Sequence, residues 1–416
     1  MTPPSSRPPP LLHAHRHRDG PCRSAGRREC GFACVPSRAE SLVGGTLAPR
    51  CGFRPRPPPP PASSISPAFC MSSAPTLVSL LHSDPMPYSD GSARTAASPF
   101  GERRYNAWND HVKRRWGGRV QKVSVAAGFT CPNRDGTLGS GGCTFCNNAG
   151  FTPGYLDRRD PIGDQIEAGL RFLDRRYPGT ERFIAYFQAY SNTYGEFARL
   201  REAYEAALAH PRICGLAIGT RPDCLPDAVL DYLAELAREH IVELEIGVES
   251  CDDEVLRRIN RGHDFACSEH AIRRAAARGL GVTAHLILGL PGETRAGMLE
   301  AARRLSALPI AALKLHQLQL VRGTAMARDW ARDPQSVPLL AEDEYIVLLA
   351  DFVERLSPEI LLQRLGSEVP PALKLAPNWN LRLSELAPRL SAELARRDSW
   401  QGRRHAPTKE GLEAGL

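Results

Sequence analysis

Short apolar runs alternate with amphipathic stretches between about residue 103 and residue 320 of this chain. The apolar runs are rich in β-branched residues and too short for buried helices, so they predict strands. The runs are Lys122–Ala126, Phe183–Phe187, Gly215–Gly219, Val242–Val248, Val282–Gly289 and Ala312–Leu320.

The stretches between these runs have apolar residues at helical spacing. Repeated strand–helix units imply a parallel sheet covered by helices, and six units suit an open barrel better than a closed eight-stranded one. We therefore expect an α/β fold, a partial (β/α)6 TIM-like barrel over residues 103–335. The predicted helices are Pro161–Tyr177, Phe197–Ala209, Asp227–Glu239, Asp253–Ile259, Ser268–Arg278 and Arg295–Leu308.

The two ends of the chain differ from this core. Residues 336–416 predict a mostly helical C-terminal extension with helices at Glu342–Leu356 and Leu383–Arg397. Residues 1–100 hold 19 of the 36 prolines and 11 arginines, which predicts a disordered tail. Alternative explanations of this tail are a start codon placed too far upstream, or an organellar transit peptide.

Charge and hydropathy change the picture little. The formal charge of the chain is +7, but residues 1–100 carry 11 bases and 5 acids and residues 101–416 carry 42 and 41, so the core is nearly neutral. Net charge therefore gives no argument for nucleic acid. With no apolar run of membrane-spanning length and no secretory signal, we expect a cytoplasmic protein that contacts no membrane and keeps its cysteines reduced.

Three cysteines lie together just after the first predicted strand. Cys131, Cys143 and Cys146 have the spacing C-x11-C-x2-C in a glycine-rich loop. Structural zinc normally takes four protein ligands, and this loop offers no fourth. A [4Fe–4S] cluster normally takes four cysteines, so three leave one iron open to a small molecule. A zinc site, a disulfide and a plain electron-transfer cluster remain alternatives.

Several segments together resemble the radical SAM superfamily, near its elongator-type branch and the YhcC-like group of uncharacterised proteins. The resemblance spans about residues 103 to 405. The segments that carry it are Gly128–Gly136, Gly142–Asn147, Ala185–Tyr194, Gly219–Cys224, Ile259–His263, Gly289–Glu293 and Leu313–His316.

This resemblance implies two cofactors, a [4Fe–4S] cluster and S-adenosylmethionine. It implies that the reduced cluster donates an electron to S-adenosylmethionine, which breaks into methionine and a 5′-deoxyadenosyl radical that takes a hydrogen atom from a substrate. An external electron donor such as flavodoxin or ferredoxin would reduce the cluster. The cluster ligands would be Cys131, Cys143 and Cys146.

The resemblance also implies residues that bind the adenosine part. Phe145 would pack near the adenine, and Gly289 would let the backbone approach it. His285 would reach the ribose. The alternatives are a hydrophobic anchor for Phe145 and a core histidine for His285.

Glu249 or Ser250, at the end of the fourth predicted strand, would accept a hydrogen bond from a ribose hydroxyl. Arg261 would bind the methionine carboxylate, because a guanidinium forks onto a carboxylate; the alternative is a surface salt bridge. Lys314 and His316 alternate with apolar neighbours and could face a substrate inside the barrel.

The substrate and the catalytic residues cannot be assigned from these patterns. The elongator-type relatives suggest tRNA modification by analogy. Two other hypotheses stay open: a non-enzymatic zinc or iron–sulfur binding module, and an electron carrier.

Overall fold

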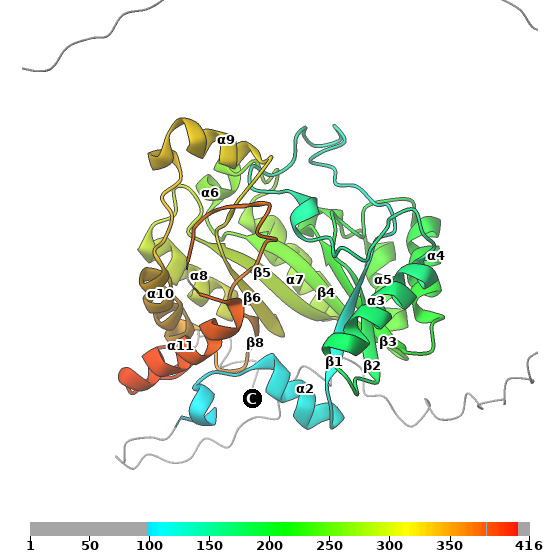
Figure 1. Ribbon diagram of the computed structural model, residues 1–416, viewed down its shortest axis with the longest axis horizontal. Helices are drawn as coiled ribbons and strands as arrows, with labels where there is room; N and C mark the ends of the chain where they lie inside the picture. The colour runs from blue at the N-terminus through cyan, green and yellow to red at the C-terminus, as the bar shows by residue number, and fades with distance from the viewer. Residues whose placement is uncertain (1–97, 380, 407–416) are drawn as a thin grey trace, which may run out of the picture. The chain divides into compact units, whose positions relative to one another are not determined.

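The computed structural model describes residues 98–379 and 381–406, and its centre is one curved, all-parallel sheet (Figure 1). The strand order is β1-β2-β3-β4-β5-β6-β8. The expected partial barrel and its six predicted strands are confirmed. The strands are β1 (Val120–Val125), β2 (Arg182–Phe187), β3 (Ile213–Thr220), β4 (Ile241–Glu249), β5 (Gly281–Leu288), β6 (Ala312–Gln317) and β8 (Leu361–Arg364).

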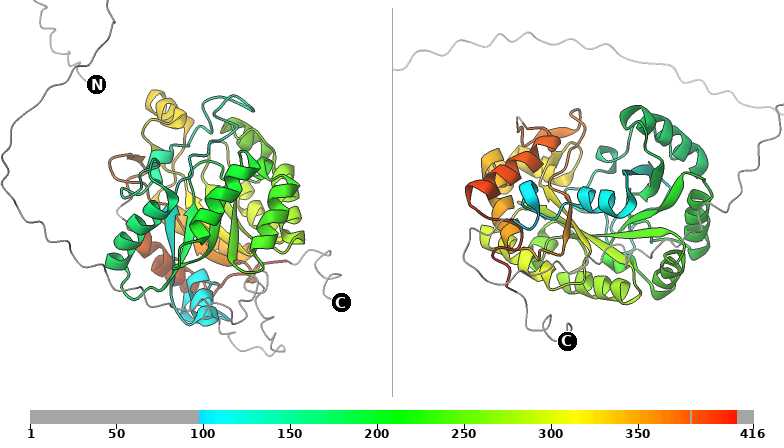
Figure 2. Two further views of the ribbon diagram at one scale, coloured as in Figure 1. Left: turned by 90° about the vertical axis from the view of Figure 1, so that its right-hand side faces the viewer. Right: turned by 90° about the horizontal axis from the view of Figure 1, so that it is seen from below.

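Helices cover the outer face of the sheet (Figures 1 and 2). One or two helices follow each of the strands β1 to β5, so every crossover between neighbouring parallel strands is helical. The helices are α3 (Ile162–Arg176), α4 (Phe197–Leu208), α5 (Asp227–Leu236), α6 (Asp253–Arg258), α7 (Phe265–Ala277) and α8 (Arg295–Ser306).

The sequence pattern did not predict the seventh strand, β8. It has only four residues and pairs in parallel with β6. The C-terminal stretch therefore adds a strand to the sheet as well as helices. Its other elements are β7 (Leu320–Val321), antiparallel to β9 (Lys374–Ala376), and the helices α9 (Ala325–Arg332), α10 (Glu342–Arg355) and α11 (Leu383–Arg396).

The two faces of the sheet differ in character, and β4 shows this best. Its even-numbered side chains, Val242 to Val248, are fully buried against the helices. Its odd-numbered positions, Glu243, Glu245, Gly247 and Glu249, lie on the inner face, because side chains alternate along a strand. The main hydrophobic core therefore lies between sheet and helices, while the inner face carries charge.

A short helix before β1 closes the base of the barrel. This helix, α2 (Trp108–Trp116), packs Val112 against a small apolar cluster at the lower inner face. The cluster separates the charged inner face from the base. Its buried members are Val112, Val120, Ile184, Tyr186 and Ala217.

A buried glutamine joins the two ends of the described chain. The Gln401 side chain is 0% exposed and accepts a hydrogen bond from the Asn106 backbone N–H at 2.9 Å. Its amide donates to the carbonyls of Ser357 and Ile360 at 2.7 and 2.8 Å, just before β8. Asn106 in turn accepts from Leu362 of β8 at 2.7 Å. We call this arrangement the Gln401 clasp.

The predicted disordered tail lies outside the described residues except for its last three positions. Among the described helices, none is both long and apolar enough to cross a membrane.

Candidate active site

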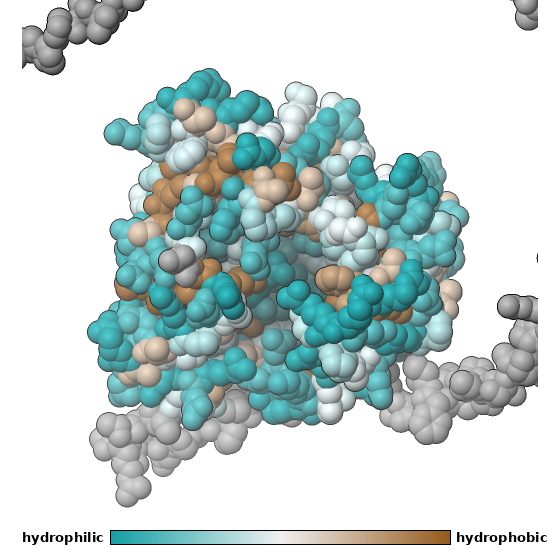
Figure 3. Space-filling model, viewed as in Figure 1, coloured by the Kyte–Doolittle hydropathy of each residue, from teal (hydrophilic) through white to brown (hydrophobic). Residues whose placement is uncertain are grey.

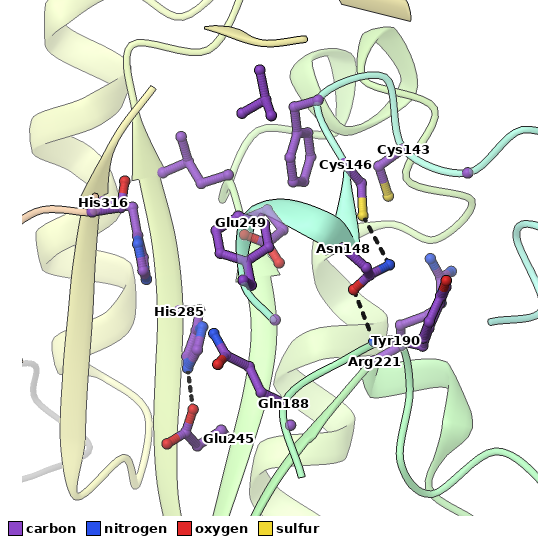
Figure 4. Close-up of a pocket in the computed structure, with 18 of the residues that line it drawn as sticks. Cys143, Cys146, Asn148, Gln188, Tyr190, Arg221, Glu245, Glu249, His285 and His316 are labelled. Carbon is purple, nitrogen blue, oxygen red and sulfur yellow. Dashed lines mark hydrogen bonds and ion pairs between the residues drawn. The ribbon is translucent and has the colours of Figure 1, made fainter. Parts of the chain in front are cut away.

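The three cysteines of the glycine-rich loop line one pocket over the inner face of the sheet. Figure 4 shows Cys143 and Cys146 in this pocket. All three are free thiols, and Cys143 is buried. The loop follows β1, as expected for a reactive group at the carboxyl end of a barrel strand. The space-filling view shows that the surface is hollowed over the inner face of the sheet (Figure 3).

Backbone contacts from two distant segments hold this loop in place. Thr144 N–H donates to the Ile259 carbonyl at 3.0 Å, and the Thr144 carbonyl accepts from Met326 of α9 at 2.9 Å. The Asn260 side chain donates to the Gly142 carbonyl at 2.9 Å. The cysteine positions are therefore fixed by the end of α6 and the start of α9.

Gly142 is required by the fold of the loop. Its φ is +79°, a region that other residues rarely adopt. A β-carbon at this position would also lie 2.7 Å from Nε of Arg134, whose guanidinium donates to the Cys146 carbonyl at 2.8 Å. Any side chain here would displace Arg134 from beneath the cysteines.

Side chains donate hydrogen bonds to two of the sulfur atoms. Arg261 Nη1 and Asn133 Nδ2 lie 3.5 and 3.7 Å from Cys143 Sγ. Asn148 Nδ2 lies 3.7 Å from Cys146 Sγ (Figure 4). Burial, with the neighbouring Cys143, raises the pKa of Cys146 to about 11, so the free thiol is a poor nucleophile. The donors suit sulfur that carries negative charge when it ligates a metal.

Two buried guanidinium groups stand beside the cysteines. Arg261 also donates to the Gly247 carbonyl at 2.5 Å, and its Nε has no partner among the described residues. Arg221 forks onto Asp223 at 2.8 and 2.7 Å, and its Nη1 likewise has no partner there. Two open, buried N–H groups are the donors that a ligand carboxylate requires.

Four of the six predicted cofactor-binding residues line the same pocket as the cysteines. These are Phe145, Glu249, Arg261 and His285. Glu249 has a left-handed φ of +67° and lies 3.7 Å from Arg261 Nη2.

The other two predicted residues, Ser250 and Gly289, are not among the residues that line the pocket. Both bond instead to Glu293: Ser250 Oγ at 2.8 Å and the Gly289 N–H at 3.0 Å. Glu293 also accepts from the Leu290 N–H at 3.0 Å. Glu293 therefore ties the ends of β4 and β5 together behind the pocket wall.

Glu293 should make stability depend on pH. Burial raises its pKa to about 7, although Ser250 and the backbone donors oppose the shift. The folded state then holds a proton that the unfolded state loses near pH 4.5, so the contribution of Glu293 is largest below pH 4.5 and is lost as pH rises through 7. Relative to Glu293→Gln, the wild type should lose about 3 kcal/mol of unfolding free energy across this window, since one pKa unit corresponds to about 1.4 kcal/mol. Urea unfolding at several pH values measures this; a constant difference would contradict it.

Glu245 lies at the centre of a charged network on the inner face below the cysteines. Its side chain is 0% exposed, and its oxygens lie 2.5 Å from the ammonium groups of Lys122 and Lys314. The Tyr186 hydroxyl donates to it at 2.6 Å, and His285 Nε2 lies 2.8 Å away (Figure 4). These partners hold the pKa of Glu245 well below its usual value despite its burial.

A second buried carboxylate, Glu243, extends this network. It lies 2.7 Å from Lys122 and accepts from Thr283 and Gln363 at 2.7 and 2.8 Å. Burial lowers the pKa of Lys314 to about 7, and Lys122 adds to the shift.

The predicted inward orientation of Lys314 and His316 agrees with these contacts, but only His316 lines the pocket. The His316 ring packs on His285 with centroids 5.4 Å apart. Sequence reasoning missed Glu243 and Glu245, although polar residues at every second position of an otherwise apolar run signal an inner barrel face.

The arrangement of ligating side chains bears on the zinc alternative. Within the part of the chain that the structure describes, no three His, Cys, Asp or Glu side chains converge closely enough to hold one metal ion. A single zinc ion needs its thiolates about 2.3 Å from one centre. A four-iron cluster instead binds each thiolate to a separate iron.

Comparison with known proteins gives consistent matches. Residues 131–305 match the Radical SAM superfamily and residues 310–396 its Radical_SAM C-terminal domain. The uncharacterised protein YtqA of Bacillus subtilis (strain 168) is 35% identical over 324 residues, which are 78% of this chain and 97% of that protein. Protein YhcC of Escherichia coli (strain K12) is 39% identical over 275 residues, 66% of this chain and 87% of that protein.

A solved structure supports the fold. The Methanocaldococcus infernus Elp3 with an N-terminal deletion superposes with a TM-score of 0.51 at 17% identity. The match covers 68% of this chain and 64% of that one.

Proposed function

This chain belongs to the radical SAM superfamily, and from that premise we propose that it is an enzyme that cleaves S-adenosylmethionine reductively and uses the resulting radical on a substrate. The observation that carries the proposal is that three free thiols line one pocket together with two buried guanidinium groups. The cysteines would hold a [4Fe–4S] cluster, Cys131, Cys143 and Cys146 each binding one iron.

The residues around the pocket fit both cofactors. Three thiols leave one iron of such a cluster open, and the open N–H groups of Arg221 and Arg261 are placed for the carboxylate of a methionine group. Phe145 and Glu249 line the same pocket and would contact the adenosine. Ser250 and Gly289 would support that contact indirectly through Glu293.

When bound and reduced by a small electron-transfer protein, the cluster supplies the electron that breaks S-adenosylmethionine into methionine and a 5′-deoxyadenosyl radical. The residues of the protein would hold the two cofactors and shield them from solvent. Arg261 and Asn148 donate hydrogen bonds to the sulfurs and so tune the charge there. The apolar cluster that α2 covers closes the base of the barrel. Water and other molecules that would quench a radical are therefore excluded from that side.

Anaerobic reconstitution of the full chain with iron and sulfide tests the proposal. We expect about four irons per chain, a reduced cluster whose electron paramagnetic resonance spectrum changes when S-adenosylmethionine is added, and 5′-deoxyadenosine that requires both reductant and protein.

Two results would contradict this proposal. One zinc ion in a colourless protein would favour the binding module. A reversible redox signal that S-adenosylmethionine does not alter would favour the electron carrier.

A further inference from the structure

Arg364, the last residue of β8, is a cation in the pocket wall. It lines the pocket on the β6–β8 side and is half-buried. Among the residues that the structure describes, none forms a hydrogen bond or ion pair with it. A partly buried charge is rarely left unpaired, because its desolvation is not offset.

A register shift explains why Arg364 faces the pocket. Leu313 of β6 pairs with Leu362, but the next residue, Lys314, pairs with Arg364, so β8 holds one extra residue. That residue, Gln363, reaches inward to Glu243. Arg364 pairs with Lys314, which also points inward, so two consecutive side chains lie on the inner face. Such bulges re-aim side chains next to active sites.

The carboxylates that β4 carries on the inner face are already engaged, and Glu249 lies 3.7 Å from Arg261 Nη2. Glu245 contacts Lys122, Lys314, Tyr186 and His285. Glu243 is held in the same way by Lys122, Thr283 and Gln363. Each of these carboxylates is therefore paired with another cation, and none of them forms an ion pair with Arg364 in the part of the chain that the structure describes.

A neutral hydrogen-bonding group stands near Arg364. His316 Nε2 is buried and has no partner in the described part of the chain. Burial lowers the pKa of His316 well below its usual value, with His285 and Arg364 adding to the shift. A neutral imidazole offers one N–H donor. Figure 4 shows His316 across the pocket from Cys143 and Cys146, so a molecule between them would reach both sides.

We propose that Arg364 and His316 form a subsite for an oxyanion, a phosphate or carboxylate group, of a small substrate. This deepens the proposed function, on which it rests for taking the pocket as the substrate site. A guanidinium fork binds either group in the plane of its N–H donors. The group would anchor the substrate on the β6–β8 side and turn the rest of the molecule toward the cysteines.

Isothermal titration of the reconstituted full chain tests this subsite. Inorganic phosphate and malonate are titrated separately at fixed ionic strength, without S-adenosylmethionine. The variants are Arg364→Gln, the charge-conserving Arg364→Lys, Arg221→Gln, and the matched control Arg175→Gln on the exposed face of α3. Circular dichroism verifies that each variant folds.

We expect one of the two anions to bind the wild type and Arg175→Gln equally, and Arg364→Gln at least about 10-fold more weakly. Arg364→Lys should bind with intermediate affinity, since it keeps the charge and loses the fork. The anion that binds identifies the oxyanion as phosphate or carboxylate. The subsite is wrong if neither anion binds, or if binding is lost in Arg221→Gln and kept in Arg364→Gln. A wild type that binds anion and yields no 5′-deoxyadenosine would count against the proposed function alone.

Discussion

Replacing Cys143 with alanine is expected to abolish both the iron centre and the formation of 5′-deoxyadenosine. Cys143 is 7% exposed, and Arg261 and Asn133 donate hydrogen bonds to its sulfur atom, which alanine removes. Two remaining thiols hold a four-iron centre poorly. Iron and sulfide analysis with quantification of 5′-deoxyadenosine measures the effect, which should reduce turnover by more than about 100-fold.

Cys267→Ala is the matched control for this experiment. Cys267 is also a free, half-buried cysteine, but it lies on α7 and is not among the residues lining the pocket. Its replacement should leave iron content and turnover unchanged. If Cys143→Ala kept four irons and its turnover, the assignment of the cluster ligands would be wrong.

Replacing Glu245 with glutamine is expected to cost about 3–5 kcal/mol of unfolding free energy. The substitution keeps the shape of the side chain but removes the negative charge from between Lys122 and Lys314. Both ammonium groups lie 2.5 Å from its oxygens in the barrel interior. Lys122 keeps its ion pair with Glu243, but Lys314 loses its ion pair with Glu245 in the buried interior. Chemical denaturation at neutral pH measures the loss.

The same carboxylate should also weaken the wild type in acid. The folded pKa of Glu245 is well below its usual value, so its contribution is present above about pH 4.5 and is lost as pH falls through the folded pKa.

Glu300→Gln serves as the control, since Glu300 forms an exposed i,i+3 pair with Arg303 on α8 and should change stability by less than about 0.5 kcal/mol. A Glu245→Gln protein as stable as this control would mean that the two lysines find other compensation.

That the three cysteines lie close together could be predicted from their spacing, because residues of one short loop stay near one another in any fold. The C-x11-C-x2-C pattern predicted one shared site for Cys131, Cys143 and Cys146 without knowledge of the fold, and the three residues line one pocket. The six longer strands could also be predicted from local sequence, since each is a short segment rich in apolar and β-branched residues that are either consecutive or at every second position. A tRNA substrate stays a prediction, as no described contact bears on it.

Other parts of the site depend on long-range geometry that no local pattern records. Ser250 directly follows Glu249, yet the left-handed φ of Glu249 turns the chain so that Ser250 meets Glu293 behind the wall. Arg364 faces the pocket because of a register shift between β6 and β8, more than 40 residues apart in sequence. A four-residue strand carries too little periodicity to reveal such a shift.

The Gln401 clasp makes the β8 side of the pocket wall depend on residues far from it in sequence. Its amide fixes the carbonyls of Ser357 and Ile360, and Asn106 fixes Leu362, so the path of the chain into β8 is set by both ends of the described region. If the N-terminal two thirds of the fold were expressed alone, the sheet would therefore lack its edge strand β8, and the charged residues on its inner face would be exposed. A C-terminal segment grafted from another protein would complete the sheet only if it carried hydrogen-bonding groups that replace those of the Gln401 clasp.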